Sequence, residues 1–187
     1  MPAIRTFVAL PSPLEVRNTL RDIQRSLVET GAHVKWDSSD KFHITLKFLG
    51  NVDSEMIPQL SQSLITVASK IPCFPLIYES VGAFPDLVRP RVIWAGARSN
   101  EVLTSLHRDV DLACKDLKFP PETRAFHPHI TLGRVKGSEN LTRLTAKVKS
   151  ITFDPVETTC SEVLLMKSDL RPTGSVYTTL KSFPLKA

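Results

Sequence analysis

One phrase, His-Ile-Thr-Leu, occurs twice in this chain of 187 residues, at 43–46 and again at 129–132. Both copies lie among β-branched and aliphatic residues, which is typical of strands. Residues two apart in a strand point to the same face, so each copy presents an imidazole beside a hydroxyl. Two such pairs facing one cleft would supply two proton-transfer groups and two neutral hydrogen-bond donors. That set suits acid–base chemistry on a small anion.

The elements around the two copies follow a similar order. Helical spacing predicts helices after a capping box at 12–15, over 51–69 with Pro58 in the first turn, after an Asn100 cap, and around 141–148. Strands are expected over 4–10, 41–49, 74–81, 91–97, 129–135, 157–167 and 175–183. This order fits a duplicated α+β unit with two lobes meeting at a central cleft. Because no Gly- or Ser-rich linker separates the halves, we expect residues 1–187 to form a single compact domain.

Composition narrows the class of protein. Hydrophobic residues make up 42% of the chain and charged residues 23%, which is typical of a globular domain. No stretch approaches the roughly 18 apolar residues of a membrane span, and residues 1–10 do not resemble a signal peptide, so we expect a cytoplasmic protein. Cys73, Cys114 and Cys160 are far apart and form no CxxC pair, which argues against a disulfide framework or a thiolate zinc site. The net charge of +5 is compatible with a polyanionic partner but does not require one.

Histidine is the natural candidate for proton transfer, because it titrates near neutral pH. His43 and His129 could serve as general acid and general base, in an order that the residues alone leave open. Thr45 and Thr131 could hold the non-bridging oxygens of a phosphate.

Two cations near the motifs could neutralise a phosphate. Regular strand alternation sends Lys47 to the histidine face and Arg134 to the opposite face. Arg134 would then reach the cleft only near a strand end or a bulge.

Other interpretations of the same residues stay open. A single His-x-Thr is most often structural, and His127 and His129 could bind zinc together with His43, although no acidic residue or cysteine lies at ligand spacing. His33 and His107 have no catalytic neighbours in the sequence, and we expect His107 at a surface or boundary. Dinucleotide, P-loop and α/β-hydrolase sites are not indicated, because their glycine-rich motifs are missing. Six aromatic residues could stack on a base, although core packing is their commoner role: Phe42, Phe48, Phe84, Trp94, Phe126 and Tyr177.

The segments 42–50 (FHITLKFLG) and 126–134 (FHPHITLGR) resemble the 2H phosphoesterase superfamily, which is named for its two His-x-Thr/Ser motifs. Within it, the chain is most similar to the RNA 2′,3′-cyclic phosphodiesterases, also called 2′-5′ RNA ligases. Supporting matches lie at 5–10, 82–85, 90–96, 166–168 and 174–177. The resemblance covers nearly the whole chain in the same order.

This resemblance implies a bilobal α+β fold with two mainly antiparallel sheets and flanking helices around a central cleft. It implies hydrolysis of RNA 2′,3′-cyclic phosphate ends to 2′-phosphomonoesters, without metal or cofactor. By the same resemblance, His43 is the proton donor to the departing 3′ oxygen and His129 is the proton acceptor that activates water. Thr45, Thr131 and Arg134 are implied to bind the phosphate.

Three related functions stay open beside this one. The same chemistry run backwards would join RNA ends through a 2′-5′ bond. A non-catalytic nucleotide- or RNA-binding module could use the same scaffold, and cyclic phosphodiesterases of tRNA splicing or of ADP-ribose belong to the same superfamily. For this protein we expect a monomer whose partner is RNA or a nucleotide with a 2′,3′-cyclic phosphate end, and no association with membranes.

Overall fold

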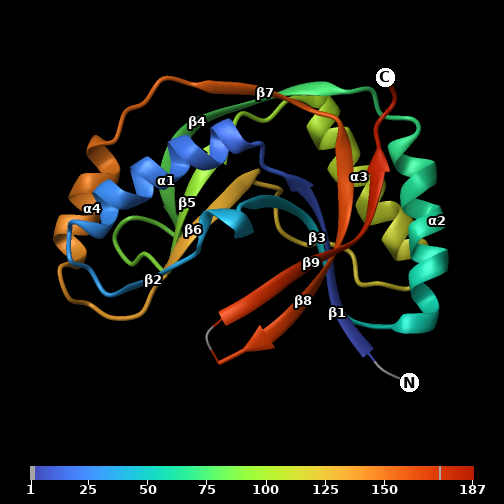
Figure 1. Cartoon of the computed structure of the whole chain (residues 1–187), viewed down its shortest axis with the longest axis horizontal. Coiled ribbons are helices and arrows are strands. Elements are labelled where there is room, and N and C mark those ends of the chain that lie inside the picture. The colour runs from blue at the N-terminus through green and yellow to red at the C-terminus, as the bar shows by residue number, and fades with distance from the viewer. Residues whose placement is uncertain (1–2, 173) are drawn as a thin grey trace.

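The computed structural model describes residues 3–172 and 174–187, which form an α+β fold with a curled antiparallel sheet (Figure 1). Within this part of the chain the strands are β1 (Ala3–Pro11), β2 (Val34–Trp36), β3 (His43–Asp53), β4 (Phe74–Phe84), β5 (Val92–Ala97), β6 (His129–Val135), β7 (Val156–Cys160), β8 (Glu162–Arg171) and β9 (Gly174–Pro184). The helices are α1 (Leu14–Val28), α2 (Ile57–Ala68), α3 (Glu101–Asp116) and α4 (Leu141–Ser150). Short 3₁₀ turns cover Ser39–Lys41 and Ser54–Met56. The predicted α+β fold class is therefore confirmed.

The strands follow the order β7-β4-β5-β6-β3-β1-β8-β9, with β2 paired to β6. The two motif strands, β3 and β6, are neighbours in the middle of this order, and Ile44 and Ile130 are their paired residues. Two sheets were expected, but the pairing of β3 with β6 at the isoleucines of the repeated phrase joins them into one sheet. Beyond the pairing with β3, residues 133–135 of β6 pair with β2 instead.

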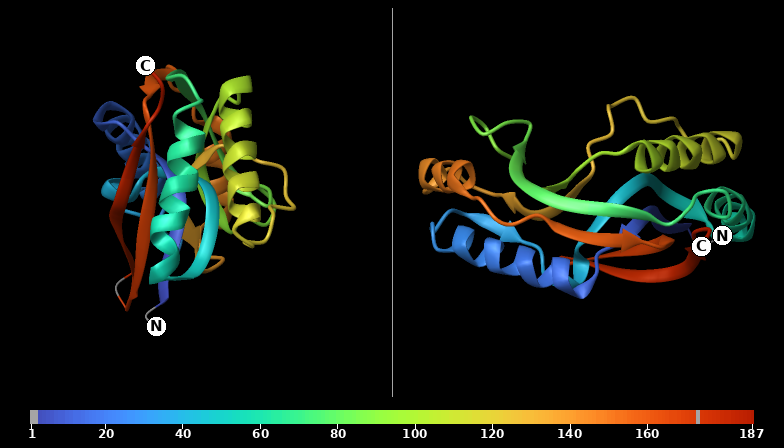
Figure 2. Two further views of the ribbon diagram at one scale, coloured as in Figure 1. Left: turned by 90° about the vertical axis from the view of Figure 1, so that its right-hand side faces the viewer. Right: turned by 90° about the horizontal axis from the view of Figure 1, so that it is seen from above.

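Helices cover the two ends of the sheet. Seen from above, α1 and α4 lie at one end of the molecule and α2 and α3 at the other (Figure 2). Helix α1, from the first half of the chain, packs against α4 and β7, whereas α3, from beyond β5, packs against β3 and α2. Each end therefore combines elements from both halves of the chain. The division of one domain into two lobes stays a prediction.

Several boundaries differ from the sequence-based expectations. Helix α2 begins at Ile57 because β3 continues to Asp53, whose carboxylate accepts a hydrogen bond from the Glu55 N–H at 3.0 Å. The expected strand 157–167 is two strands, β7 and β8, that are separated at Ser161, and β2 was not predicted at all. Pro58 does lie in the first turn of α2.

The predicted helix caps had opposite outcomes. The capping box at 12–15 is wrong, because Pro13 is the N-cap of α1 and makes no side-chain cap hydrogen bond. The Asn100 cap is confirmed, since its side-chain oxygen accepts a hydrogen bond from the Leu103 N–H at 2.8 Å. None of the helices in the described part of the chain has the length and apolar character that a membrane span requires.

Both motif strands carry a bulge at the leucine of the repeated phrase. Along β3, Thr45 pairs with Ala9 and Lys47 with Val8, which leaves Leu46 as the extra residue. Along β6, the register with β5 skips Leu132 in the same way. A bulge changes which face the following residues occupy. The two strands therefore stop alternating regularly directly after each His-x-Thr.

The bulges overturn the expected directions of the two cations. Lys47 points into the protein, with 2% of its side chain exposed. The next residue, Phe48, lines the cleft in its stead. Arg134 occupies the equivalent position of the second copy and lines the cleft. The expectation from regular alternation was wrong for both residues, and the bulge is the physical reason.

The bulge in β6 is held by Gln24 from α1. The Gln24 side chain donates to the carbonyls of Asp37 at 2.7 Å and Leu132 at 2.8 Å, and the Asp37 N–H also donates to the Leu132 carbonyl at 2.9 Å. Gln24→Met keeps the length of the side chain but removes both donors. We expect it to lower the free energy of unfolding by about 1–2 kcal/mol, measured by urea denaturation. Gln62→Met, on the exposed face of α2, is the control, and equal stability of the two variants would contradict this role.

Candidate active site

The site begins at the pairing of Ile44 with Ile130, whose side chains are both buried in the core. The histidine and threonine on either side of each isoleucine must therefore point to the other face of the sheet. Because the strands are antiparallel, each histidine lies across from the threonine of the other copy. The repeated phrase thus builds an approximately two-fold symmetric set of four polar side chains.

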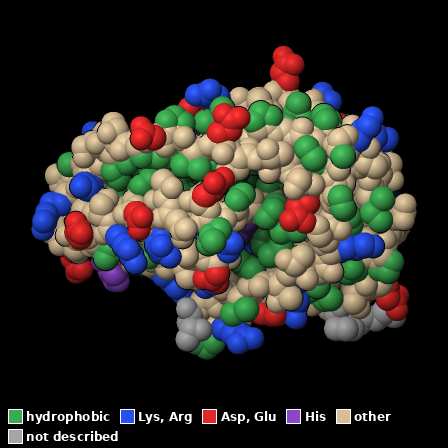
Figure 3. Space-filling view, turned by 45° about the horizontal axis from the view of Figure 1, so that its top comes forward, with side chains coloured by type: hydrophobic (Ala, Val, Ile, Leu, Met, Phe, Trp, Pro, Cys, Tyr) green, Lys and Arg blue, Asp and Glu red, His purple; other side chains and the backbone are tan. Residues whose placement is uncertain are grey.

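These side chains open into a cleft of about 980 Å³. Figure 3 looks onto this hollow, where apolar surface and a patch of histidine lie at the floor and charged side chains of both signs lie around the rim. The cleft is lined by Asp37, Lys41, His43, Thr45, Phe48, Phe84, Pro85, Asp86, Arg89, Arg91, Val92, His107, Glu122, Arg124, Ala125, Phe126, His127, His129, Thr131, Arg134 and Tyr177. The structure therefore brings together His43, Thr45, His129, Thr131 and Arg134, whereas Lys47 is not among the lining residues.

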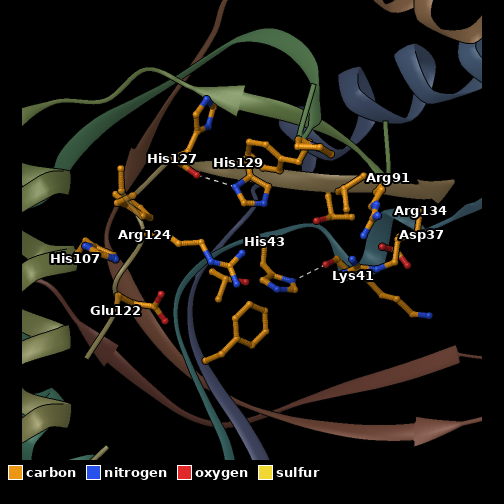
Figure 4. Close-up of a pocket in the computed structure, with 18 of the residues that line it drawn as sticks. Asp37, Lys41, His43, Arg91, His107, Glu122, Arg124, His127, His129 and Arg134 are labelled. Atoms are coloured by element: carbon orange, nitrogen blue, oxygen red, sulfur yellow. Dashed lines mark hydrogen bonds between the residues drawn. The ribbon is translucent and has the colours of Figure 1, made fainter. Parts of the chain in front are cut away.

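The two imidazoles are oriented in the same way (Figure 4). Nδ1 of His43 lies 2.6 Å from the Lys41 carbonyl, and Nδ1 of His129 lies 2.7 Å from the His127 carbonyl. A carbonyl can only accept a hydrogen bond, so Nδ1 carries the proton in both rings. Nε2 of each ring is then free to take a proton when the ring is neutral or to give one when it is charged.

Aromatic neighbours fix both rings. The rings of His43 and Tyr177 form a T-shaped pair with centroids 5.2 Å apart, and the centroid of the Phe7 ring lies 4.8 Å from that of His43. His129 meets Phe84 in the same edge-on manner at 4.9 Å. Such contacts restrain ring rotation and keep water from the apolar sides of the imidazoles.

Burial shapes the protonation of both histidines. It lowers the pKa of His43, and the charge of His129 lowers that pKa further, whereas the hydrogen bond to the Lys41 carbonyl opposes the shift. It also lowers the pKa of His129, with additional lowering from His127 and Arg134 against the hydrogen bond to the backbone. A charged His129 therefore makes it harder to protonate His43. The state with one imidazolium and one neutral imidazole is favoured over the state in which both rings are charged.

The cleft carries more positive than negative charge. Lys41, Arg89, Arg91, Arg124 and Arg134 face three carboxylates: Asp37, Asp86 and Glu122. Burial raises the pKa of Asp37, although the nearby charges of Arg134 and Lys41 act in the opposite direction. A cleft of this composition attracts an anion such as a phosphodiester.

The chain that carries these two His-Thr pairs is similar to known proteins in both sequence and fold. Residues 10–94 and 97–177 match the family described as LigT like Phosphoesterase. The chain belongs to this family. The sequence-based resemblance to the 2H phosphoesterases is therefore confirmed.

Relatives of this LigT-like chain match over nearly its full length. An RNA 2′,3′-cyclic phosphodiesterase of Thermotoga maritima is 30% identical over 177 residues, which cover 95% of this chain and 93% of that protein. One from Archaeoglobus fulgidus is 32% identical over 181 residues, which cover 96% and 99%.

Solved structures agree with these sequence matches. TT0787 of Thermus thermophilus superposes with a TM-score of 0.82 at 28% identity and covers 98% of both chains. E. coli LigT in complex with 3′-AMP gives a TM-score of 0.77 at 26% identity and covers 99% of both chains. The fold is thus that of the LigT-like phosphoesterases.

The structure adds one cleft residue that the sequence did not link to the site, although its half-buried position agrees with the boundary position expected for it. His107, which was expected at a surface or boundary, lines the cleft and stacks on Phe126 with centroids 4.0 Å apart and planes 13° apart. No sequence signal links these residues, because one lies on α3 and the other on the segment before β6. Of the six aromatic candidates, four line the cleft: Phe48, Phe84, Phe126 and Tyr177. Phe42 is buried, and Trp94 is half-buried against Phe84 and His127.

The zinc alternative concerned His127, His129 and His43. The ring centroids of His127 and His129 are 6.2 Å apart. Across residues 3–172 and 174–187, no three His, Cys, Asp or Glu side chains are grouped in a way that could hold a metal ion.

Proposed function

We propose that this LigT-like phosphoesterase hydrolyses the 2′,3′-cyclic phosphate at the end of an RNA strand to a 2′-phosphomonoester. The observation that carries the proposal is the pair of free imidazole Nε2 atoms, each beside a threonine hydroxyl, that face one basic cleft. The names of the relatives from Thermotoga maritima and Archaeoglobus fulgidus support the same activity. A non-catalytic binding module is less favoured, because a binder has no need for two opposed titratable groups.

The reaction follows from the two-fold arrangement. In-line displacement needs a base and an acid on opposite sides of phosphorus, and the two copies place one imidazole from each strand around a common centre. A water oxygen attacks phosphorus while its proton passes to Nε2 of His129. The bond from phosphorus to the 3′ oxygen breaks, and that oxygen takes the proton from Nε2 of His43. This assignment of base and acid rests on the family resemblance.

Three further residues are assigned to the phosphate. The hydroxyls of Thr45 and Thr131 donate to its non-bridging oxygens, where negative charge grows as the water attacks. Arg134, which the bulge turns into the cleft, adds a positive charge beside His129. If a 5′-hydroxyl attacks phosphorus in place of water and the 3′ oxygen leaves, the same groups join two RNA ends through a 2′-5′ bond. In the reverse step the 3′-hydroxyl attacks and the 5′ oxygen leaves, which restores the cyclic phosphate.

The test is hydrolysis of a short RNA that ends in a 2′,3′-cyclic phosphate, with excess EDTA present. We expect turnover to continue and the product to be the 2′-phosphomonoester. Loss of all activity with EDTA, or a 3′-phosphomonoester product, would overturn the proposed reaction. Comparing the hydrolysis rates of mononucleotide, RNA and ADP-ribose cyclic phosphates distinguishes the substrate classes within the superfamily. RNA or nucleotides with a cyclic phosphate end are the proposed partners. A monomer in the cytoplasm stays a prediction.

The lowered pKa values of the two histidines predict the pH dependence. The free protein needs one charged and one neutral imidazole, so kcat/KM falls once pH rises above both pKa values or drops below both. Because burial moves both pKa values below 6.5, we expect the maximum of kcat/KM below pH 6.5. A bound phosphodiester favours the imidazolium, so the maximum of kcat should lie at higher pH. Rates between about pH 4 and pH 9 test this, and a kcat/KM maximum above about pH 7 would contradict it.

A further inference from the structure

Lys47 follows the first motif and has no part in the mechanism above, yet its ammonium group is buried. Only 2% of the side chain is exposed, and Nζ donates to Asp111 on α3 at 2.5 Å and to the Pro120 carbonyl. Glu122 lies 4.0 Å away. Burying an ammonium group costs several kcal/mol unless neighbouring groups compensate for its charge. These partners therefore supply the compensation, and they all lie far from Lys47 in the sequence.

Asp111 extends the contact to the same segment of chain. The oxygen that accepts from Lys47 also accepts from the Glu122 N–H at 3.1 Å. Burial acts to raise the pKa of Asp111. The hydrogen bonds from Lys47 and from the Glu122 backbone, together with the charges of Lys47 and His107, outweigh it, so that the pKa is lowered. The pair thus fastens the segment 120–127 at a carbonyl and at an amide two residues further on. Beyond its far end, the Pro128 carbonyl accepts from the Ala97 N–H at 3.0 Å.

The fastened segment forms one wall of the cleft. Glu122, Arg124, Phe126 and His127 line it, and Phe126 is stacked against His107 from α3. Figure 4 shows His107, Glu122 and Arg124 on one side of the two motif histidines, and Asp37, Arg91 and Arg134 on the other side. A cationic side chain next to stacked aromatic rings is the combination that holds single-stranded nucleic acid.

We propose that Lys47 is a positioning residue: with Asp111 it holds residues 120–127 in place as the wall that binds the nucleotides next to the cyclic phosphate end of RNA. This inference rests on the proposed function and deepens it. The phosphate itself is held at the two motifs, so the Lys47–Asp111 pair sets the affinity for the strand and takes no part in proton transfer.

The deciding variant removes both charges at once. A single change, Lys47→Met or Asp111→Leu, leaves one buried charge without its partner and destabilises the protein, which would obscure the effect on binding. The double variant Lys47→Met/Asp111→Leu removes both charges and is expected to fold, but it offers no donor to the Pro120 carbonyl and no acceptor to the Glu122 N–H. If the pair only stabilises the fold, a double variant that folds should bind RNA as the original protein does. If the pair positions residues 120–127, the double variant should fold and still bind RNA more weakly.

Two substrates separate the wall from the motifs: a 2′,3′-cyclic mononucleotide and a short single-stranded RNA with the same end. In the double variant we expect KM for the RNA to rise about tenfold, which is the loss of roughly one base-stacking contact. The His127 carbonyl that orients His129 lies next to Pro128, whose own carbonyl the Ala97 N–H still holds in the double variant. We therefore expect kcat for both substrates and KM for the mononucleotide to stay within about twofold of the original values. Hydrogen exchange should become faster at the amides of 122–127 and stay unchanged in β6.

Asp109→Asn is the matched control, since Asp109 lies on the same helix in an exposed pair with Arg108 and should change none of these quantities. An unchanged KM for the RNA in the double variant, or an equal rise for both substrates, would overturn the proposal. The Kd for RNA ending in a 2′-phosphate is measured in parallel, because it does not depend on turnover. If the protein turns over neither substrate, the proposed function fails, and this Kd still decides the role of the pair: weaker binding supports it and equal binding overturns it.

Discussion

His43→Ala and His129→Ala are each expected to lower kcat on RNA with a cyclic phosphate end by about 10²- to 10⁴-fold. Each variant keeps the pairing of the motif strands and removes the imidazole that its strand presents to the cleft. Single-turnover rates with circular dichroism as a check on folding would measure the effect. His33→Ala is the control, because that exposed histidine lies outside the cleft and should retain full activity.

A sulfur-substituted substrate tells the acid from the base. When the 3′ bridging oxygen of the cyclic phosphate is replaced by sulfur, the leaving group departs as a thiolate and needs no proton. If His43 is the proton donor, His43→Ala regains most of its lost rate on this substrate and His129→Ala does not. The reverse pattern would mean that the two roles are exchanged, and no recovery in either variant would contradict the acid–base mechanism.

Thr45→Val and Thr131→Val are each expected to lower kcat/KM by about 10²- to 10³-fold, because each removes a donor aimed at the phosphate while keeping the shape of the side chain. The two losses should be similar, since each threonine lies across from the histidine of the other copy. Thr45→Ser and Thr131→Ser keep the hydroxyl and should retain most of the activity.

Initial rates over a range of substrate concentrations measure these losses. Thr66→Val, at an exposed position on α2, controls for general effects of the substitution. A loss below about threefold in both motif variants would remove the hydroxyls from the mechanism.

The sequence was sufficient to predict the parts of the site that follow from local periodicity. His43 and Thr45 share a face because they are two residues apart in a strand, and the second copy obeys the same rule. That the copies face each other needed only the duplicated order of elements. The Asn100 cap and the position of Pro58 are equally local features, and both are confirmed.

The parts that the sequence did not predict depend on distant partners. The bulges at Leu46 and Leu132 are set by the register with β1 and β5 and, in β6, by Gln24 from α1. No local pattern in the phrase marks them, so regular alternation assigned Lys47 and Arg134 to the wrong faces. Only the family resemblance implied that Arg134 reaches the phosphate. The stacking of His107 on Phe126 likewise joins α3 to a segment with no regular structure.

The bulges also limit how far the two copies can remain equivalent. At the position after each bulged leucine, Lys47 reaches α3 in the first copy, whereas Gly133 leaves room for β2 in the second, since a Cβ there would lie 2.7 Å from Trp36. One residue later, Phe48 stands in the cleft on one strand and Arg134 on the other. A site with perfect two-fold symmetry would present identical groups to a substrate and to the same substrate turned over. Five residues after each histidine the two copies present different groups to the substrate, Phe48 in the first and Arg134 in the second. The cleft therefore has an apolar side and a cationic side, so the 2′ and 3′ oxygens of a cyclic phosphate are no longer in equivalent surroundings.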